Sequence, residues 1–174
     1  MWPCPTLDHP GTPYLYKDSK FDTPTGKGQL FAAPWRAPAE VPDTAYPLLL
    51  CTVREVGHYS CRSMTGNCAA LQSLADEPSF VKINPADADL LGIKDKQLVW
   101  ARSRRGKIIS RAEVNERINI GSVYMTYQWW IGACNELTND NLDPISKTPE
   151  TKYCAVNVSL TTDENFVMTT YSDS

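Results

Sequence analysis

The chain has 174 residues, 42% of them apolar, and a formal net charge of −3. This length favours one domain with a substantial hydrophobic core. The acidic balance argues against a general nucleic-acid binder, which should be basic overall. No apolar run is long enough for a transmembrane helix, and the amino terminus shows no signal-peptide pattern. We therefore expect a cytoplasmic protein that is not inserted in a membrane.

Residues 1–45 differ in composition from the rest of the chain. Prolines stand at positions 3, 5, 10, 13, 24, 34, 38 and 42. Proline fixes φ and removes a hydrogen-bond donor, so this segment should be extended and irregular. Side chains such as Tyr14, Phe31 and Trp35 make it too apolar for a free linker. We interpret residues 1–45 as a strap that lies on a surface outside this chain.

From Tyr46 onward the sequence predicts short strands and two short helices. In chain order these are a strand over 46–53, a helix over 67–75, a strand over 80–83, a helix from Asn84 to Gly92, and strands over 97–103, 107–114, 122–129 and 153–160. Asn84 is the expected N-cap of its helix, with Pro85 in the first turn. Arg104-Arg105-Gly106 is the expected hairpin turn, with the glycine at positive φ. Such short strands favour a small closed barrel over 46–160, followed by a polar tail over 161–174.

The six cysteines indicate reduced thiols rather than a disulfide framework. They form no Cys-x-x-Cys pair, and no feature of the sequence marks secretion. We expect several to be buried as small hydrophobic side chains. His58 and Cys61 have a spacing found in metal sites, but a structural zinc site needs a second ligand pair. We therefore expect no metal ligands in this chain.

A polar cluster follows directly after the first predicted strand. Arg54 can offer a planar guanidinium to a phosphate or a heteroaromatic ring. His58 can donate a hydrogen bond to an anionic or pterin-like ligand. On residue types alone, the simpler explanation is a hydrogen-bonded loop in which Arg54 and Glu55 make surface ion pairs.

A second cluster lies at the end of the strand predicted over 122–129. Tyr127 and Gln128 can contact a ligand through a hydroxyl and an amide. Lys152, just before the last strand, can offer a point charge to a phosphate. Core packing and an ordinary surface lysine are the simpler alternatives. The basic hairpin at Arg104 and Arg105 is best interpreted as a solvated turn.

Five motifs occur together in an order that resembles one protein family. They are Trp2-Pro3-Cys4-Pro5, Gly11–Tyr16, Thr52–Ser60, Ile83–Ala88 with Leu91-Gly92-Ile93, and Asn135–Thr138. Over about residues 2–158 the chain is similar to the carboxy-terminal part of the catalytic subunit of molybdenum formate dehydrogenases. The formate hydrogenlyase type, in the dimethyl sulfoxide reductase superfamily, is the most similar.

The resemblance implies a mainly β fold, a six-stranded double-psi β-barrel with short helices. It also implies that this barrel binds bis(molybdopterin guanine dinucleotide) carrying molybdenum or tungsten. Arg54, Glu55, His58 and Ser60 match the segment that lines the cofactor, and Tyr127 and Lys152 match later contacts. Tyr59, Gln128 and Asn135 are added as further candidate contacts.

The family's catalytic residues and its [4Fe–4S] cysteines lie in earlier domains and have no match here. The resemblance therefore implies that this chain holds the cofactor but is inactive alone in converting formate to carbon dioxide. The implied partners are the remainder of the catalytic subunit and an iron–sulfur electron-transfer subunit, in anaerobic metabolism.

Two other functions stay open at this point. Gly121-Ser122 resembles the self-cleavage site of a pyruvoyl-type decarboxylase barrel, although most Gly-Ser pairs are turns. A non-catalytic barrel that docks on a partner through its strap would also explain the composition of residues 1–45.

Overall fold

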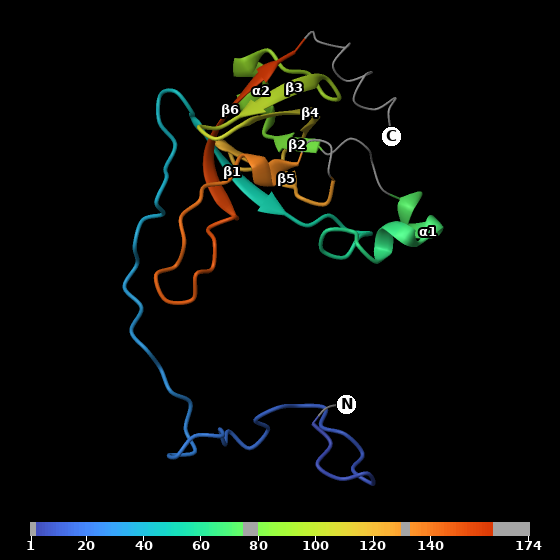
Figure 1. Ribbon diagram of the computed structural model, residues 1–174, viewed down its shortest axis with the longest axis vertical. Coiled ribbons are helices and arrows are strands. Elements are labelled where there is room, and N and C mark those ends of the chain that lie inside the picture. The colour runs from blue at the N-terminus through green and yellow to red at the C-terminus, as the bar shows by residue number, and fades with distance from the viewer. Residues whose placement is uncertain (1–2, 75–79, 130–132, 162–174) are drawn as a thin grey trace. The chain divides into compact units, whose positions relative to one another are not determined.

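Six strands form a closed barrel in the computed structural model, which describes residues 3–74, 80–129 and 133–161 (Figure 1). The strands are β1 (Leu48–Val53), β2 (Phe80–Ile83), β3 (Leu98–Arg102), β4 (Lys107–Val114), β5 (Ser122–Thr126) and β6 (Tyr153–Leu160). Around the barrel their order is β1-β5-β2-β4-β3-β6. The predicted mainly β fold, a closed barrel with few helices, is confirmed.

Two parallel pairs are built into an otherwise antiparallel barrel. Strand β1 runs parallel to β5, and β2 runs parallel to β4. Each parallel pair joins strands that are far apart in the sequence, because parallel neighbours need a long crossover connection. Closure pairs both edges of every strand, which removes the exposed edges that invite aggregation.

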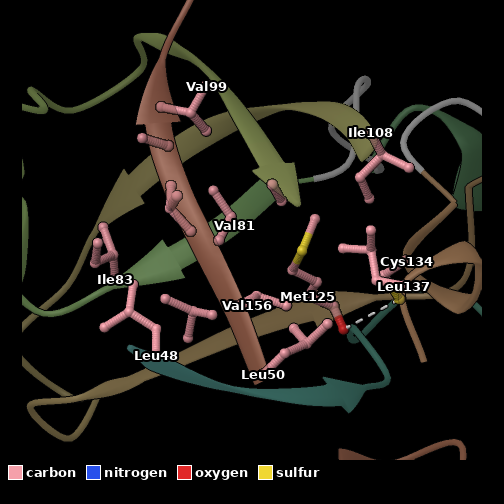
Figure 2. Close-up of a cluster of buried hydrophobic side chains, with 14 of the residues drawn as sticks. Leu48, Leu50, Val81, Ile83, Val99, Ile108, Met125, Cys134, Leu137 and Val156 are labelled. Atoms are coloured by element: carbon pink, nitrogen blue, oxygen red, sulfur yellow. Dashed lines mark hydrogen bonds between the residues drawn. The ribbon is translucent and has the colours of Figure 1, made fainter. Parts of the chain in front are cut away.

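Alternating side chains of the strands fill the barrel. In β1 the buried positions are Leu48, Leu50 and Thr52, with half-buried residues between them. Figure 2 shows Leu50 and Met125 in this core, together with Cys134 and Leu137 from the loop after β5. The Cys134 thiol donates to the Met125 carbonyl at 3.9 Å, so this hydrogen bond attaches the loop to β5. Burial of each large aliphatic side chain contributes about 1.5–3 kcal/mol.

Helix α2 (Pro85–Leu91) begins and ends as the sequence predicts. The Asn84 side chain accepts a hydrogen bond from the Ala86 N–H at 2.8 Å. Gly92 closes the helix with φ +67°, a left-handed conformation that a glycine adopts without strain. No helix within the described part of the chain is long and apolar enough to cross a membrane.

Two predicted elements are shorter in the structure by three or more residues. The helix predicted over 67–75 is a 3-10 turn, η1 (Thr65–Asn67), followed by the single-turn α1 (Ala69–Gln72). Residue 75 lies outside the described residues. Strand β5 ends at Thr126 rather than at 129, because the Thr126 hydroxyl accepts the Gln128 N–H at 3.2 Å and bends the chain.

The turn between β3 and β4 corrects one prediction. Gly106 is not among the residues with positive φ. A glycine fits there because the Glu136 carbonyl would lie only 3.0 Å from an added Cβ atom. The turn is closed by the Ser103 N–H, which donates to the Gly106 carbonyl at 2.9 Å. Close approach of backbone, not turn conformation, therefore explains this glycine.

The basic hairpin is not a simple solvated turn. By internal contacts the chain divides into two units, residues 1–37 and 38–174. Within the second unit, Arg105 makes a bidentate pair with Glu40, at 2.5 and 3.0 Å. Glu40 also accepts the Ala155 N–H of β6 at 2.6 Å. Arg104 bonds Asp43 in the same stretch. Residues 40–43 are thus held on the barrel by two arginines.

Within the first unit, residues 3–37 have neither helix nor strand, as their proline content predicts. Local contacts shape this segment, such as the Thr12 hydroxyl bonded to the Pro3 carbonyl at 2.7 Å and the stacked rings of Tyr16 and Phe21. Several large apolar side chains are exposed on it, including Phe31 (79%) and Trp35 (84%). Exposure of this kind is what a strap covered by another surface would show.

Candidate functional site

The site arises where three segments meet at one end of the barrel. Val53, the last residue of β1, is in register with Thr126, the last residue of the parallel strand β5. The segments that follow β1 and β5 therefore leave the barrel side by side. The Thr52 N–H donates to the Lys152 carbonyl at 3.3 Å, which brings the start of β6 to the same place. Two of the predicted clusters and Lys152 are thus brought together by strand register.

Gln128 fastens the loop after β1 to the end of β5. Its Oε1 accepts the Glu55 N–H at 3.1 Å, and its Nε2 donates to the His58 carbonyl at 2.8 Å and the Glu55 carbonyl at 3.4 Å. The Thr126 hydroxyl also bonds Oε1, at 3.1 Å. The side chain is only 4% exposed. All the donor and acceptor positions of this amide are occupied within the chain.

The loop that Gln128 holds has an unusual backbone. Gly57 has φ +108°, and the non-glycine residues Ser60 and Arg62 have φ +48° and +66°. Left-handed conformations of non-glycine residues cost free energy and often cluster at ligand sites. The loop is closed by Thr65, whose hydroxyl accepts the Tyr59 N–H at 3.1 Å and bonds His58 Nδ1 at 2.9 Å.

Two adjoining pockets share Gln128 and Trp129 in their walls. The smaller one, about 120 Å³, is lined by Glu55, His58 and Lys82 among others. We call it the inner pocket. The larger and more open one, about 450 Å³, lies over Arg62 and Tyr127 and is called the outer pocket. Its volume is in the range of small-molecule sites.

The two pockets differ in charge. In the inner pocket, the Lys82 ammonium lies 2.8 Å from Glu55 and 3.8 Å from Glu113, so one cation faces two carboxylates. In the outer pocket, the Arg62 guanidinium stacks on the Trp129 ring at 3.3 Å. The outer pocket therefore combines a flat cationic group with aromatic side chains, a surface suited to planar or anionic ligands.

The nine predicted site residues do not all lie in the two pockets. Glu55, His58, Tyr127 and Gln128 line the two pockets. Lys152 lies beside them, with its ammonium 4.4 Å from the Tyr127 ring centre. Arg54, Tyr59, Ser60 and Asn135 line neither pocket, and Arg54, Tyr59 and Asn135 are exposed. Of the surface ion pairs that the simpler explanation expected in this loop, the structure shows one between Glu55 and Lys82, at 2.8 Å.

Other pocket residues carried too weak a signal in the sequence. Lys82 and Glu113 are half-buried and in register on β2 and β4, which only the strand pairing reveals. Trp129 ends the strand predicted over 122–129, for which core packing was the simpler alternative, and it is 6% exposed. Thr65 was not singled out in the sequence, because its two partners, His58 and Tyr59, are defined only by the folded loop.

The cysteines are free thiols with contrasting environments. Burial raises the pKa of Cys134 to about 12 and that of Cys154 to about 11. A hydrogen bond from the Ser63 backbone lowers the pKa of the exposed Cys61. Among residues 3–74, 80–129 and 133–161, no group of three or more His, Cys, Asp or Glu side chains is placed to hold a metal ion.

Fold and site together define a closed six-stranded β-barrel domain with two adjoining pockets where β1 and β5 end. Residues 48–155 match the molydopterin dinucleotide binding domain, and the chain belongs to this family. Over 94% of its length the chain is 61% identical to formate dehydrogenase H of Escherichia coli strain K12. It is 43% identical over 91% of its length to the F420-dependent formate dehydrogenase 2 subunit alpha of Methanococcus maripaludis.

The similarity extends to enzymes with other names. The assimilatory nitrate reductase catalytic subunit of Bacillus subtilis is 38% identical over 90% of the chain. The solved structure of acetylene hydratase from Pelobacter acetylenicus superposes with a TM-score of 0.64 over 85% of this chain and 25% of that one. At 17% identity, this last similarity shows the shared fold alone. The chain spans 23% of the length of the two formate dehydrogenases.

Proposed function

We propose that the chain is the cofactor-holding part of a formate dehydrogenase catalytic subunit, inactive by itself. The observation that carries this proposal is the 61% identity to formate dehydrogenase H, over nearly the whole chain. Of the three functions that the sequence left open, family membership supports this one. The proposed cofactor is bis(molybdopterin guanine dinucleotide), with molybdenum or tungsten, and any [4Fe–4S] cluster belongs to another part of the subunit.

The residues present fit such a group. A pterin dinucleotide carries flat rings, phosphates and many hydrogen-bonding atoms. The outer pocket offers a flat guanidinium on Trp129 and the hydroxyl of Tyr127, with Lys152 at its side. His58 Nε2 is buried, with no hydrogen-bond partner among the described residues. An unsatisfied buried polar atom is costly unless a ligand completes it.

In this proposal the chain's own residues hold and orient the cofactor. Arg54, Glu55, His58, Tyr59, Ser60, Tyr127, Asn135 and Lys152 remain the proposed contacts. Gln128 remains in the set, with the role of fixing the loop that carries Glu55 and His58. When bound, the metal–pterin group supplies two-electron chemistry, while the protein sets its position and electrostatic surroundings.

Two wider assignments rest on the same resemblance. They are anaerobic metabolism and two partners, the remainder of the subunit and an iron–sulfur electron-transfer subunit. The proposed cytoplasmic location rests on the sequence features described above. The exposed apolar side chains of residues 3–37 support a strap that is covered in the complete subunit.

An anaerobic titration of the 174-residue chain with released molybdopterin guanine dinucleotide tests the proposal. We expect saturable amide shifts at 54–60, at Tyr127 and at Lys152, and no formate oxidation by the chain alone. Replacing Lys152 with Ala should weaken binding, whereas Lys147→Ala, in an exposed loop, should not. Formate turnover by the chain alone would contradict the proposal, as would saturable shifts confined to other surfaces.

A further inference from the structure

We propose that Thr65 holds the neutral His58 ring in the tautomer that is protonated on Nε2, so that His58 presents an N–H donor to an acceptor atom of the bound ligand. Thr65 is then a positioning residue, and His58 makes the contact. The donor role rests on the proposed function, whereas the tautomer is a property of the free chain.

Hydrogen-bond capacity at Thr65 decides the tautomer. The Thr65 hydroxyl oxygen already accepts the Tyr59 N–H at 3.1 Å. Its only other contact in the described part of the chain is His58 Nδ1, at 2.9 Å. If Nδ1 carried the proton, the hydroxyl would accept twice and its own hydrogen would have no acceptor. If the hydroxyl donates to Nδ1, the hydroxyl uses both its hydrogen and its oxygen, Nδ1 is the acceptor, and the proton of the neutral ring must be on Nε2.

The other ring nitrogen, Nε2, is then a hydrogen-bond donor that is available to a ligand. Nε2 is buried and forms no hydrogen bond with residues 3–74, 80–129 or 133–161. The ring contacts Trp129 in a perpendicular arrangement, with centroids 5.9 Å apart. An aromatic face is at best a weak acceptor, so this contact does not replace a true hydrogen bond. A ligand carbonyl, ring nitrogen or phosphate oxygen would complete it.

The backbone of His58 is fixed as firmly as its ring. Gln128 Nε2 donates to the His58 carbonyl at 2.8 Å, and Thr65 bonds both the ring and the next backbone N–H. His58 also lines the inner pocket, beside Glu55 and Lys82. His58, with its backbone carbonyl and Nδ1 bonded and its Nε2 unsatisfied, is therefore preorganised for a ligand.

Nitrogen NMR of the free chain tests the tautomer directly. The chain has two histidines, which simplifies the spectrum. In ¹⁵N-labelled protein at about pH 8.5, where an ordinary imidazole is neutral, we expect His58 Nδ1 to resonate as an acceptor nitrogen and Nε2 as a protonated one. His9 is an internal reference, because its Nδ1 accepts the Gly11 N–H at 3.0 Å.

Two variants then test the role of Thr65. Thr65→Ser keeps the hydroxyl and should leave the His58 shifts in place. Thr65→Val removes it and should move the two nitrogen shifts toward each other, with His9 and the barrel amides unchanged. A wild-type His58 protonated on Nδ1, or a Thr65→Val chain with unchanged His58 shifts, would overturn the proposal.

The donor role is tested in the complete subunit. His58→Gln replaces the Nε2–H with an amide donor at a similar distance, whereas His58→Leu removes the donor. We expect the Leu variant to release pterin roughly tenfold faster than the Gln variant. Equal release rates would overturn the donor role. A wild-type subunit that contains no pterin would overturn the proposed function, and with it the donor role, while the tautomer would still be decided by NMR.

Discussion

Gln128 and His58, 70 positions apart in the chain, are joined by a hydrogen bond of 2.8 Å from the glutamine amide to the histidine carbonyl. This contact ties the loop after β1 to the end of β5. It makes one buried side chain responsible for the shape of a loop that it does not belong to. The consequence can be tested with a nearly isosteric substitution.

Gln128→Glu should release the loop over residues 55–58. The carboxylate has no N–H to donate and would face the carbonyls of Glu55 and His58. A buried group that loses its partners typically costs about 1–3 kcal/mol, and more when charged. We expect a lower free energy of unfolding and faster amide hydrogen exchange at 55–59. Gln97→Glu is the control, because Gln97 is exposed and its side-chain oxygen, which a carboxylate retains, accepts the Lys94 N–H. Equal effects of the two substitutions would contradict this role.

Glu40→Gln should reduce stability in a pH-dependent manner. Hydrogen bonding to Arg105 holds the pKa of Glu40 below its ordinary value of 4.5. A carboxyl group with a lowered pKa stabilises the folded state at pH values above its pKa in the unfolded state. This stabilisation disappears as the pH falls through its pKa in the folded state. The variant should therefore lose roughly 1–3 kcal/mol at pH 7 and progressively less below about pH 4.5.

Denaturant unfolding at several pH values measures this difference. Glu116→Gln, at an exposed position, is the matched control and should follow the wild-type curve. A gap between wild type and Glu40→Gln that stays constant from pH 7 to about pH 3 would show that the carboxylate charge is not involved.

Five of the six thiols should react in two groups, with the half-buried Cys51 between them. Cys4, Cys61 and Cys68 are exposed, and the pKa of Cys61 is lowered by the Ser63 backbone hydrogen bond. Cys134 and Cys154 are buried, with pKa values raised to about 12 and 11. With iodoacetamide at about pH 8, we expect Cys61 to be alkylated first and the buried pair only after unfolding. Peptide mass spectrometry over time would show the order, and early labelling of Cys134 would contradict the core described above.

Leu50→Ala should be among the more damaging apolar substitutions. Leu50 is fully buried in β1, so the shorter side chain leaves a cavity in the barrel. Losses of about 2–5 kcal/mol are typical of such changes. Leu90→Ala, at a site that is 86% exposed on α2, should change stability by less than about 0.5 kcal/mol. Similar unfolding midpoints for the two variants would be inconsistent with the register of β1.

Local sequence signals predicted what local interactions determine. The cap at Asn84 and the stop at Gly92 follow from residues next to each other, and the structure confirms both. Strand β5 was predicted too long, since apolar periodicity continues to Trp129 while the Thr126 hydroxyl bends the backbone earlier. The role of Gly106 was also wrong, because the Glu136 carbonyl that excludes a side chain comes from a distant loop.

The placement of the candidate residues was predictable only in part. Glu55 and His58 were singled out because they follow a predicted strand, and Tyr127 and Gln128 because they end one. The structure brings these four to the walls of the two pockets. The pairing of Lys82 with Glu55 and Glu113 depends on which strands are neighbours, and no local pattern encodes that. The hydrogen bonds from the Gln128 amide to Glu55 and His58 likewise depend on the pairing of β1 with β5, which the sequence does not reveal.

The pairing of β1 with β5 and β6 has a consequence for the order of folding. Every segment of the site depends on contacts between residues about 70 to 100 positions apart, such as Thr52 with Thr151 and Glu55 with Gln128. Contacts of this sequence separation close a long loop of chain and form slowly. The ends of β1, β5 and β6 therefore meet only when the last strand has docked. If the proposed function holds, the cofactor would therefore be bound only by barrels in which β6 is already in place.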